Sequence, residues 1–267
     1  MVHKLGLDGV ASQFKNVYSA QNMCKVISAC GGVKFVTQIF RCTITLVVLM
    51  ATITSAQELP KMPSITAGQV DISQSLNELV VRQTSESGII NWDSFNVSKG
   101  AGVIFEQPSA KAITLNNILS AAPSVIDGQL TAPGRVFFSS PSGIVFGENA
   151  RVNVNTLLAT NHSIERAGEN EFDLKNPGLG QVLNLGALNA KSAYLIGRDV
   201  LNAGQITSSN GSIGLVAASD VRVSFDEAGL LTATILADDV LGTVTNTGML
   251  NAGERGVNVP INDNLSF

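Results

Sequence analysis

Apolar and polar residues alternate along the region that begins after residue 65. Val70, Ile72, Leu79 and Val81 fall on one side of this pattern, with polar residues between them. A period of two residues is typical of a β-strand that buries one face. Short runs of this kind recur to the end of the chain, separated by Gly, Asn and Ser. Because no stretch shows the sustained period of a helix, the pattern predicts an all-β protein.

The last third of the chain repeats itself. Residues 184–190, NLGALNA, match residues 202–208, NAGQITS, and match again residues 246–252, NTGMLNA. The starts of these segments lie 18 and 44 residues apart, and 44 equals two periods of 22. A period near 20 that combines strands with turn residues is typical of a β-solenoid, whose coils stack around a continuous core. We therefore expect clear coil repeats from about residue 181, with each Gly after Asn at a corner that requires positive φ.

The segments between the repeated corners supply the expected core. SAYLIGRDV, residues 192–200, is echoed by SIGLVAASDV, residues 212–221. The positions that we expect to point inward are Val182, Leu188, Ile206, Ile213, Leu215, Val244 and Leu250. The competing arrangement is an antiparallel sandwich, whose strands also recur every 8–12 residues.

The front of the chain has the pattern of an export signal. Residues 42–54, CTITLVVLMATIT, form an uncharged and mostly apolar run that follows two basic residues and precedes small residues up to Ala56. The run is shorter than the roughly 20 residues that a membrane-spanning helix needs. We predict a signal peptide over residues 1–56, cleaved after Ala56. Two explanations of its length stay open: an extended signal, or a true start at Met23.

Charge and cysteine content change sharply at this boundary. Residues 1–41 carry five basic residues and one Asp, whereas 12 basic and 20 acidic residues remain from residue 57 onward. An acidic exported part lacks the basic surface that nucleic-acid binding needs. All three cysteines lie in the front segment, at Cys24, Cys30 and Cys42. With 45% hydrophobic residues, the chain is too apolar for disorder.

Histidine and cysteine are scarce after residue 56, where the chain has one histidine and no cysteine. The alternative that we consider is a β-helix enzyme that degrades polysaccharide, which requires clustered carboxylates with a base or a cation. His162 is the only histidine in this part, so a Ser-His-Asp triad would have to use it. We expect His162 to be an exposed structural residue. The sequence predicts no catalytic residue, no metal site and no cofactor.

A series of motifs follows the only tryptophan in a fixed order. The first are Ile90-Asn91-Trp92, Ser94-Phe95-Asn96-Val97, Val103-Ile104-Phe105 and Gln107-Pro108-Ser109; the next are Ala112–Ile118, Ile126–Leu130, Gly134–Phe138, Ser140–Gly147 and Ala150–Val154. Over about residues 63–260 they resemble the N-terminal secretion domain of filamentous-haemagglutinin-like exoproteins. This family is also called the two-partner secretion or haemagglutination activity domain, and the branch resembled is that of the high-molecular-weight adhesins.

The chain departs from the family in two respects. Where the family has Asn-Pro-Asn-Gly, this sequence has Ser140-Pro141-Ser142-Gly143. Pro fixes φ and Gly permits positive φ, so we expect the turn to be retained and exposed. Family exoproteins continue for many further coils, whereas this sequence stops at Phe267. A fragment, a truncated gene and a short family member are the alternatives.

The resemblance implies a right-handed parallel β-helix with an N-terminal cap over residues 57–267. It implies export into the periplasm, recognition there by a dedicated outer-membrane barrel transporter, and release at the surface of a Gram-negative bacterium. Surface adhesion through a host-cell or surface receptor would follow, without a nucleic acid or a cofactor. Trp92, Phe95 and Phe105 would close the N-terminal end of the core. The candidate secretion-motif residues are Asn91, Trp92, Phe95, Asn96, Asn116, Ser140, Pro141, Ser142, Gly143 and Gly147.

The predicted signal peptide leads to a direct test. If residues 1–56 are removed on export, N-terminal sequencing of the exported protein should begin near Gln57, because the small residues up to Ala56 fit signal peptidase. Folded protein outside the cytoplasm that still begins at Met1 or Met23 would contradict this prediction.

Overall fold

The computed structural model describes residues 57–236, 242–253 and 257–258, the last pair by backbone alone. The predicted signal peptide, residues 1–56, lies outside the described residues. The regular structure that is described consists of 22 β-strands, as the alternating pattern predicts. This part of the chain contains no helix long and apolar enough to cross a membrane.

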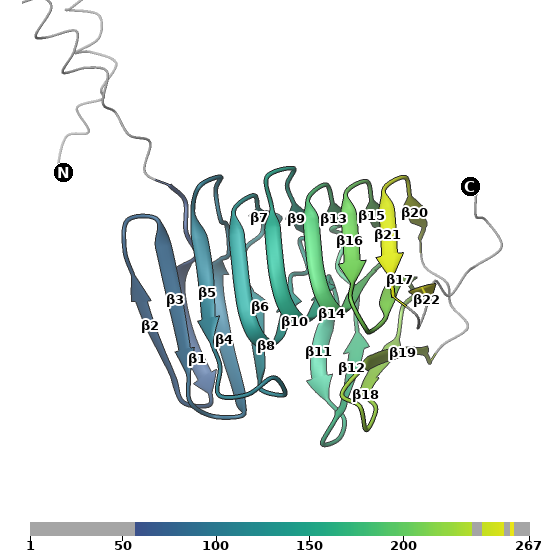
Figure 1. Cartoon of the computed structure of the whole chain (residues 1–267), viewed down its shortest axis with the longest axis horizontal. Helices are drawn as coiled ribbons and strands as arrows, with labels where there is room; N and C mark the ends of the chain where they lie inside the picture. The colour runs from purple at the N-terminus through teal and green to yellow at the C-terminus, as the bar shows by residue number, and fades with distance from the viewer. Residues whose placement is uncertain (1–56, 237–241, 254–256, 259–267) are drawn as a thin grey trace, which may run out of the picture. The chain divides into compact units, whose positions relative to one another are not determined.

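Successive coils stack along one axis, and each contributes a long bent course of strand (Figure 1). Three coils have one continuous long strand: β8 (Gln129–Ser139), β10 (Arg151–Thr160) and β14 (Ala187–Gly197). In the other coils the same course is divided between β3 (Glu78–Gln83) and β4 (Ser87–Ser94), β5 (Gly102–Glu106) and β6 (Ile113–Ile118), β16 (Gln205–Ser208) and β17 (Ile213–Ala217), and β21 (Met249–Ala252) and β22 (Val257–Asn258). These courses pair in parallel from coil to coil.

A short strand closes each coil. These short strands are β7 (Ser124–Ile126), β9 (Ile144–Phe146), β13 (Val182–Asn184), β15 (Val200–Asn202) and β20 (Val244–Asn246), and they form a second parallel sheet. In the first coil Val97 takes this place and bridges to Ile126. The architecture is therefore a parallel β-helix and not a sandwich. Its coils begin at β3, well before the repeats that are visible in the sequence.

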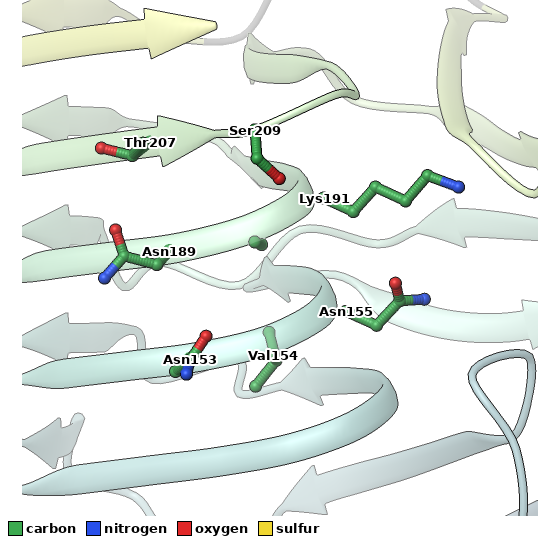
Figure 2. A pocket seen from close by; sticks show the side chains of 8 residues that line it. Asn153, Val154, Asn155, Asn189, Lys191, Thr207 and Ser209 are labelled. Atoms are coloured by element: carbon green, nitrogen blue, oxygen red, sulfur yellow. The ribbon is translucent and has the colours of Figure 1, made fainter. Parts of the chain in front are cut away.

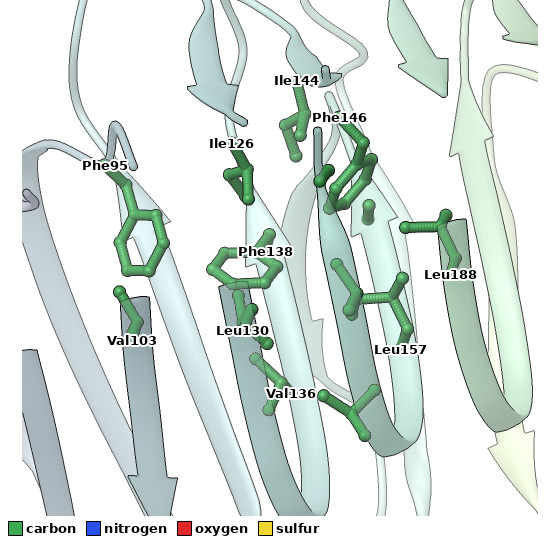
Figure 3. Close-up of a cluster of buried hydrophobic side chains, with 14 of the residues drawn as sticks. Phe95, Val103, Ile126, Leu130, Val136, Phe138, Ile144, Phe146, Leu157 and Leu188 are labelled. Atoms are coloured by element: carbon green, nitrogen blue, oxygen red, sulfur yellow. The ribbon is translucent and has the colours of Figure 1, made fainter. Parts of the chain in front are cut away.

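The register between coils stacks apolar residues into columns. Leu130, Val152, Leu188, Ile206 and Leu250 are paired in succession from β8 to β21. They join the core drawn in Figure 3, where side chains from the long and short strands meet in the interior. The expected inward positions are confirmed: Val182, Leu188, Ile206, Ile213 and Leu215 are buried, and Val244 and Leu250 are partly buried against the same core.

The 44-residue spacing corresponds to one coil and not to two. Gln205 pairs directly with Met249, and Asn202 pairs directly with Asn246. Between these pairs the chain leaves the coil and forms β18 (Val221–Phe225) and β19 (Leu231–Ile235) as an antiparallel hairpin. The expectation of two periods is therefore wrong, because the extra residues are an insertion that returns the chain to the original register.

The corner glycines are required by close contact and not by φ. Among the described glycines, Gly186, Gly204 and Gly248 are not in the positive-φ group. A Cβ atom on Gly204 would lie 2.3 Å from the carbonyl oxygen of Gly186, and one on Gly248 would lie 2.1 Å from that of Gly204. The expectation of positive φ is wrong here, because stacked backbones approach each other so closely that only glycine fits.

The asparagines beside these glycines form a ladder along the axis. The side-chain amide of Asn184 donates to Oδ1 of Asn202 at 2.7 Å, and Asn202 donates to Oδ1 of Asn246 at the same distance. Oδ1 of Asn184 also accepts from the backbone amide of Gly186 at 3.1 Å. An amide both donates and accepts, so identical amides satisfy one another along the stack, in which Asn184 and Asn202 are buried and Asn246 is exposed.

Two antiparallel strands cover the N-terminal end of the stack. β1 (Lys61–Ala67) pairs with β4, and β2 (Val70–Gln74) pairs with β3. Trp92, Phe95 and Phe105 are buried in the first two coils, and Phe95 contacts Trp92 at 5.2 Å and Phe138 at 4.9 Å between ring centroids. These aromatic residues fill the interior, and β1 and β2 cap the hydrogen-bonding edges that would otherwise be free.

An outer sheet that the sequence analysis did not predict covers one side of the β-helix. It consists of β11 (Ser163–Arg166), β12 (Glu171–Lys175), β18 and β19, all antiparallel. Its apolar face packs on residues that point outward from the second half of the long strands, including Phe137, Leu158 and Tyr194. Val136 and Phe138, on either side of Phe137, belong to the inner core. This half of each strand is therefore buried on both faces.

His162 is buried and links the two insertions, so the expectation of an exposed His162 is wrong. It follows β10, where the chain leaves one coil toward β11. Its Nε2 lies 2.9 Å from the carbonyl oxygen of Ala218, where the chain leaves β17 toward β18, and must donate to it. Nδ1 lies 2.9 Å from the hydroxyl of Thr160 and accepts from it. Burial lowers the pKa of His162 and outweighs the opposing effects of the Ala218 and Ser219 backbone and of Asp220.

Replacing an inward residue should cost far more than replacing its outward neighbour on the same strand. Leu188→Ala should lower the free energy of unfolding by about 2–5 kcal/mol, because it removes a buried side chain and leaves a cavity. Asn189→Ala is the control, since Asn189 is exposed, and should change stability by less than about 0.5 kcal/mol. Equal changes in the urea midpoints of the two variants would contradict the register.

The neutral state of His162 makes stability depend on pH. Its pKa is lower in the folded protein than in the unfolded chain, so the unfolded chain takes up the proton first as pH falls. The free energy of unfolding should therefore decrease as pH is lowered from 7.5 to 5, by at most about 1.4 kcal/mol per pH unit. His162→Gln should lose this slope. The lowered pKa values of Glu58 and Asp173 act only at more acidic pH. If urea titrations at several pH values give the same pH dependence of the free energy of unfolding for both proteins, His162 is not its source.

Candidate functional site

The turns that join the long strands to the short strands lie along one edge of the β-helix. We call this the turn edge and define it as residues 93–97, 119–123, 140–143 and 176–181 of four successive coils. Hydrogen bonds join the turns to the neighbouring coils. The backbone amide of Val125 donates to Oδ1 of Asn96 at 2.8 Å, and the hydroxyl of Ser142 donates to the carbonyl oxygen of Ser120 at 2.7 Å. The turn edge is therefore a continuous structure and not a set of separate loops.

The turn Ser140–Gly143 lies in the middle of this edge. Gly143 has a φ of 100° and its amide donates to the carbonyl oxygen of Ser140 at 2.9 Å, which confirms the expected turn. The expectation that the turn is exposed is wrong for Ser140 and Gly143, which are buried, while Ser142 is half-buried and only Pro141 is exposed. Turns of the neighbouring coils cover it from both sides.

The segment 176–181 presses closely on this turn. A Cβ atom on Gly178 would lie 2.0 Å from the carbonyl oxygen of Pro141, and one on Gly180 would lie 2.0 Å from the carbonyl carbon of Ser142. The amide of Gly180 donates to the oxygen of Pro141 at 3.1 Å. Glycines in the next coil therefore allow the turn to be packed so tightly.

The structure brings most of the other predicted residues to the same part of the molecule. Phe95 and Asn96 belong to the first turn of the edge, and Trp92 donates from Nε1 to Oδ1 of Asn116 at 3.0 Å just inside it. Asn91 is half-buried on β4 and its Oδ1 accepts from Asn117 at 3.0 Å. These contacts support the turns from within.

Gly147 is the candidate that lies elsewhere. It occupies the opposite corner, where a Cβ atom would lie 2.2 Å from Oδ1 of Asp127. Its own carbonyl oxygen lies 2.5 Å from the Cβ position of Gly186, so it continues the column of corner glycines. Gly147 is therefore required for stacking and is separate from the turn edge.

The first residues after the predicted cleavage site reach the turn edge. Glu58 accepts from the Asn96 amide at 3.2 Å, and its backbone amide donates to the Ser98 hydroxyl at 2.7 Å. The hydrogen bond from Asn96 lowers the pKa of Glu58, with a further contribution from Lys61. The carboxylate therefore stays ionised and holds this segment against the first turn.

Three apolar residues project from consecutive turns of this edge, a feature that the sequence analysis missed. Leu119 is 65% exposed and Leu179 is 85% exposed. Pro141, on the turn between them, is exposed as well. We call Leu119, Pro141 and Leu179 the apolar row. A signal was present in the sequence, because each apolar residue stands among small or turn-forming residues where a buried side chain is not expected.

One surface groove shows no catalytic grouping among the residues that line it. It crosses β10, β14 and β16 and has a volume of about 440 Å³ (Figure 2). Amide, hydroxyl and aliphatic groups line it, with Lys191 as the single charged residue. Within the described part of the chain, no cluster of three His, Cys, Asp or Glu residues is placed to hold a metal ion. His162 is also unsuited to a triad, because both of its ring nitrogens are bonded within the protein.

Comparison with known proteins identifies relatives in Haemophilus influenzae. A heme/hemopexin-binding protein of Haemophilus influenzae strain Rd is 31% identical over 222 residues, which cover 78% of this chain and 24% of that protein. A second heme/hemopexin-binding protein of H. influenzae is 33% identical over 117 residues, which cover 43% of this chain and 13% of that protein. The chain thus spans about a quarter or less of the curated relatives that it matches.

Solved secretion domains share the fold. The HMW1 secretion domain from H. influenzae superimposes with a TM-score of 0.66 at 25% identity, over 75% of this chain and 55% of that one. The filamentous hemagglutinin secretion domain has a TM-score of 0.51 at 18% identity, over 76% of this chain and 80% of that one, and shows the fold alone.

The family that matches is one of secretion domains and not of enzymes, so the polysaccharide-degrading alternative has no support. Its match extends over residues 52–265, which includes the β-helix, the cap and the outer sheet. The chain belongs to the TPS secretion domain family, the secretion-targeting modules of two-partner exoproteins.

Proposed function

We propose that this chain directs the export of a filamentous-haemagglutinin-like exoprotein, and that an outer-membrane barrel transporter recognises it in the periplasm along the turn edge. The observation that carries the proposal is the apolar row beside the family's characteristic turn. Exposed apolar patches, especially those rimmed by polar groups, mark protein interaction sites. The mature protein would reach the bacterial surface and serve adhesion to a host-cell or surface receptor.

The arrangement of the turn edge supports a role in recognition. Leu119 and Leu179 lie on turns that are locked to Ser140–Gly143 by hydrogen bonds and by glycine contacts. A partner that binds the row would therefore meet a preformed surface and would not have to order it, which favours affinity. Ser140 and Ser142 act as positioning residues in this proposal, since they are shielded by the neighbouring turns.

The heme or hemopexin binding in the names of the relatives is not part of this proposal. The matched region covers 24% of the first relative. His162 is the only histidine after residue 56, and it is buried with its ring nitrogens occupied.

The double variant Leu119→Ser with Leu179→Ser tests the proposal. Burying a leucine contributes roughly 1.5–3 kcal/mol, so binding to the cognate transporter should weaken by about tenfold or more. Export should fall when the double variant is co-expressed with the transporter. The free energy of unfolding of the purified protein, measured by urea titration, should change by less than about 0.5 kcal/mol because both residues are exposed.

Leu76→Ser is the matched control. Leu76 is 78% exposed in the turn between β2 and β3, away from the turn edge, so its replacement should leave export unchanged. If the double variant is exported as well as the original protein, or if Leu76→Ser impairs export equally, the apolar row is not the recognised surface.

A further inference from the structure

Arg135 is a buried cation without a counter-charge. It lies in the middle of β8 and is 4% exposed. Its guanidinium carbon stacks 3.4 Å from the ring centroid of Phe225 in the outer sheet. Among the described residues its guanidinium group makes no ion pair and no hydrogen bond, and its Nε is a buried donor with no partner. A buried charge of this kind is costly unless it is paired.

Two further buried polar groups without partners stand beside it. The hydroxyls of Thr156 on β10 and Ser192 on β14 are buried and make no hydrogen bond within the described part of the chain. Thr156 is directly in register with Arg135 on one side and with Ser192 on the other. Neighbouring strands are about 4.8 Å apart, so the three side chains form one row across three coils.

The strand pattern places this row beneath the outer sheet. Val136, Leu157 and Ala193 follow the three residues directly and point into the inner core. Since successive side chains alternate, Arg135, Thr156 and Ser192 point outward, toward the side that the outer sheet covers. The structure has only five buried side-chain atoms without partners among its described residues, and three of them are in this row.

The turn between β18 and β19 closes the row from outside. A Cβ atom on Gly229 would lie 3.3 Å from Nη2 of Arg135, and Lys191 donates to the carbonyl oxygen of Ala228 at 3.2 Å. The two acidic residues of this turn do not neutralise Arg135, because Asp226 and Glu227 are exposed and Asp226 accepts from the amide of Leu230. The site therefore holds hydrogen-bond donors and an uncompensated positive charge.

We propose that Arg135, Thr156 and Ser192 bind a small oxyanion of single charge, of the carboxylate or dihydrogen phosphate type. A guanidinium stacked on a ring leaves its N–H groups free in its own plane, where they match an oxyanion. The two hydroxyls donate to the same anion from the adjacent coils. Binding satisfies all three groups and joins the β18–β19 hairpin to the coils beneath it.

The experiment uses the full chain and two probes, sodium formate and sodium phosphate at pH 6. Sodium chloride replaces each probe so that ionic strength stays constant. Formate or phosphate should raise the thermal unfolding midpoint in a saturable way and shift one arginine Nε–H resonance in the nitrogen NMR spectrum. A response to formate alone identifies a carboxylate site, and a response to phosphate alone identifies a phosphate site.

Variants assign the response to this row. Arg135→Met should abolish the shifted resonance and weaken the apparent affinity by about tenfold or more, because charge-assisted hydrogen bonds are lost. Arg166→Met is the matched control, since Arg166 also stacks on a ring of the outer sheet, Phe172, at 5.1 Å but is exposed. Thr156→Val keeps the shape of the side chain, removes one donor, and should weaken the response even if Arg135→Met fails to fold.

Two results would overturn the proposal. The first is an equal response of the original protein, Arg135→Met and Thr156→Val. The second is the absence of any saturable response to either probe, which would mean that ordered water alone satisfies the three groups.

Discussion

Parallel pairing between coils, at the spacing of neighbouring strands, is the constraint on which the rest of this structure depends. Each coil must return the chain to the same register about 4.8 Å further along the axis. At the corners this spacing leaves room only for glycine, as the contacts of Gly204 and Gly248 show. In the interior it aligns like residues, so apolar columns and the ladder from Asn184 to Asn246 can form. The spacing between coils therefore determines which residue types fit at each position of a coil.

The same constraint determines where insertions are tolerated. Residues can be added where the chain leaves the long strand, provided that it returns in register. Arg151 still meets Ala187 across the insertion that holds β11 and β12, and Gln205 still meets Met249 across the insertion that holds β18 and β19. The two insertions pair with each other, cover an otherwise exposed face of the β-helix and are joined at their origins by His162. Turns outside this cover remain available to a partner.

The sequence predicts those features that depend on local pattern. Alternation identifies Leu79 and Val81 as inward residues, and the repeats identify the column of Leu188 and Ile206. The outer sheet escaped prediction because β12 and β18 pair across about 50 residues and local periodicity carries no information about that contact. One signal was available: continuous apolar runs such as Val136-Phe137-Phe138 are typical of strands buried on both faces. Ser140 and His162 were misjudged for the same reason, since distant segments bury them.

We propose that the outer-membrane transporter recognises the turn edge of the stacked coils. Site-specific photocrosslinking tests it most directly, with a photoreactive benzoylphenylalanine introduced at Leu179 or at Leu76 and the cognate transporter co-expressed. Both positions are highly exposed, so neither substitution should disturb the fold. We expect a crosslink to the transporter from position 179 and none from position 76. Crosslinks of equal yield from both positions, or a crosslink from position 76 alone, would contradict it.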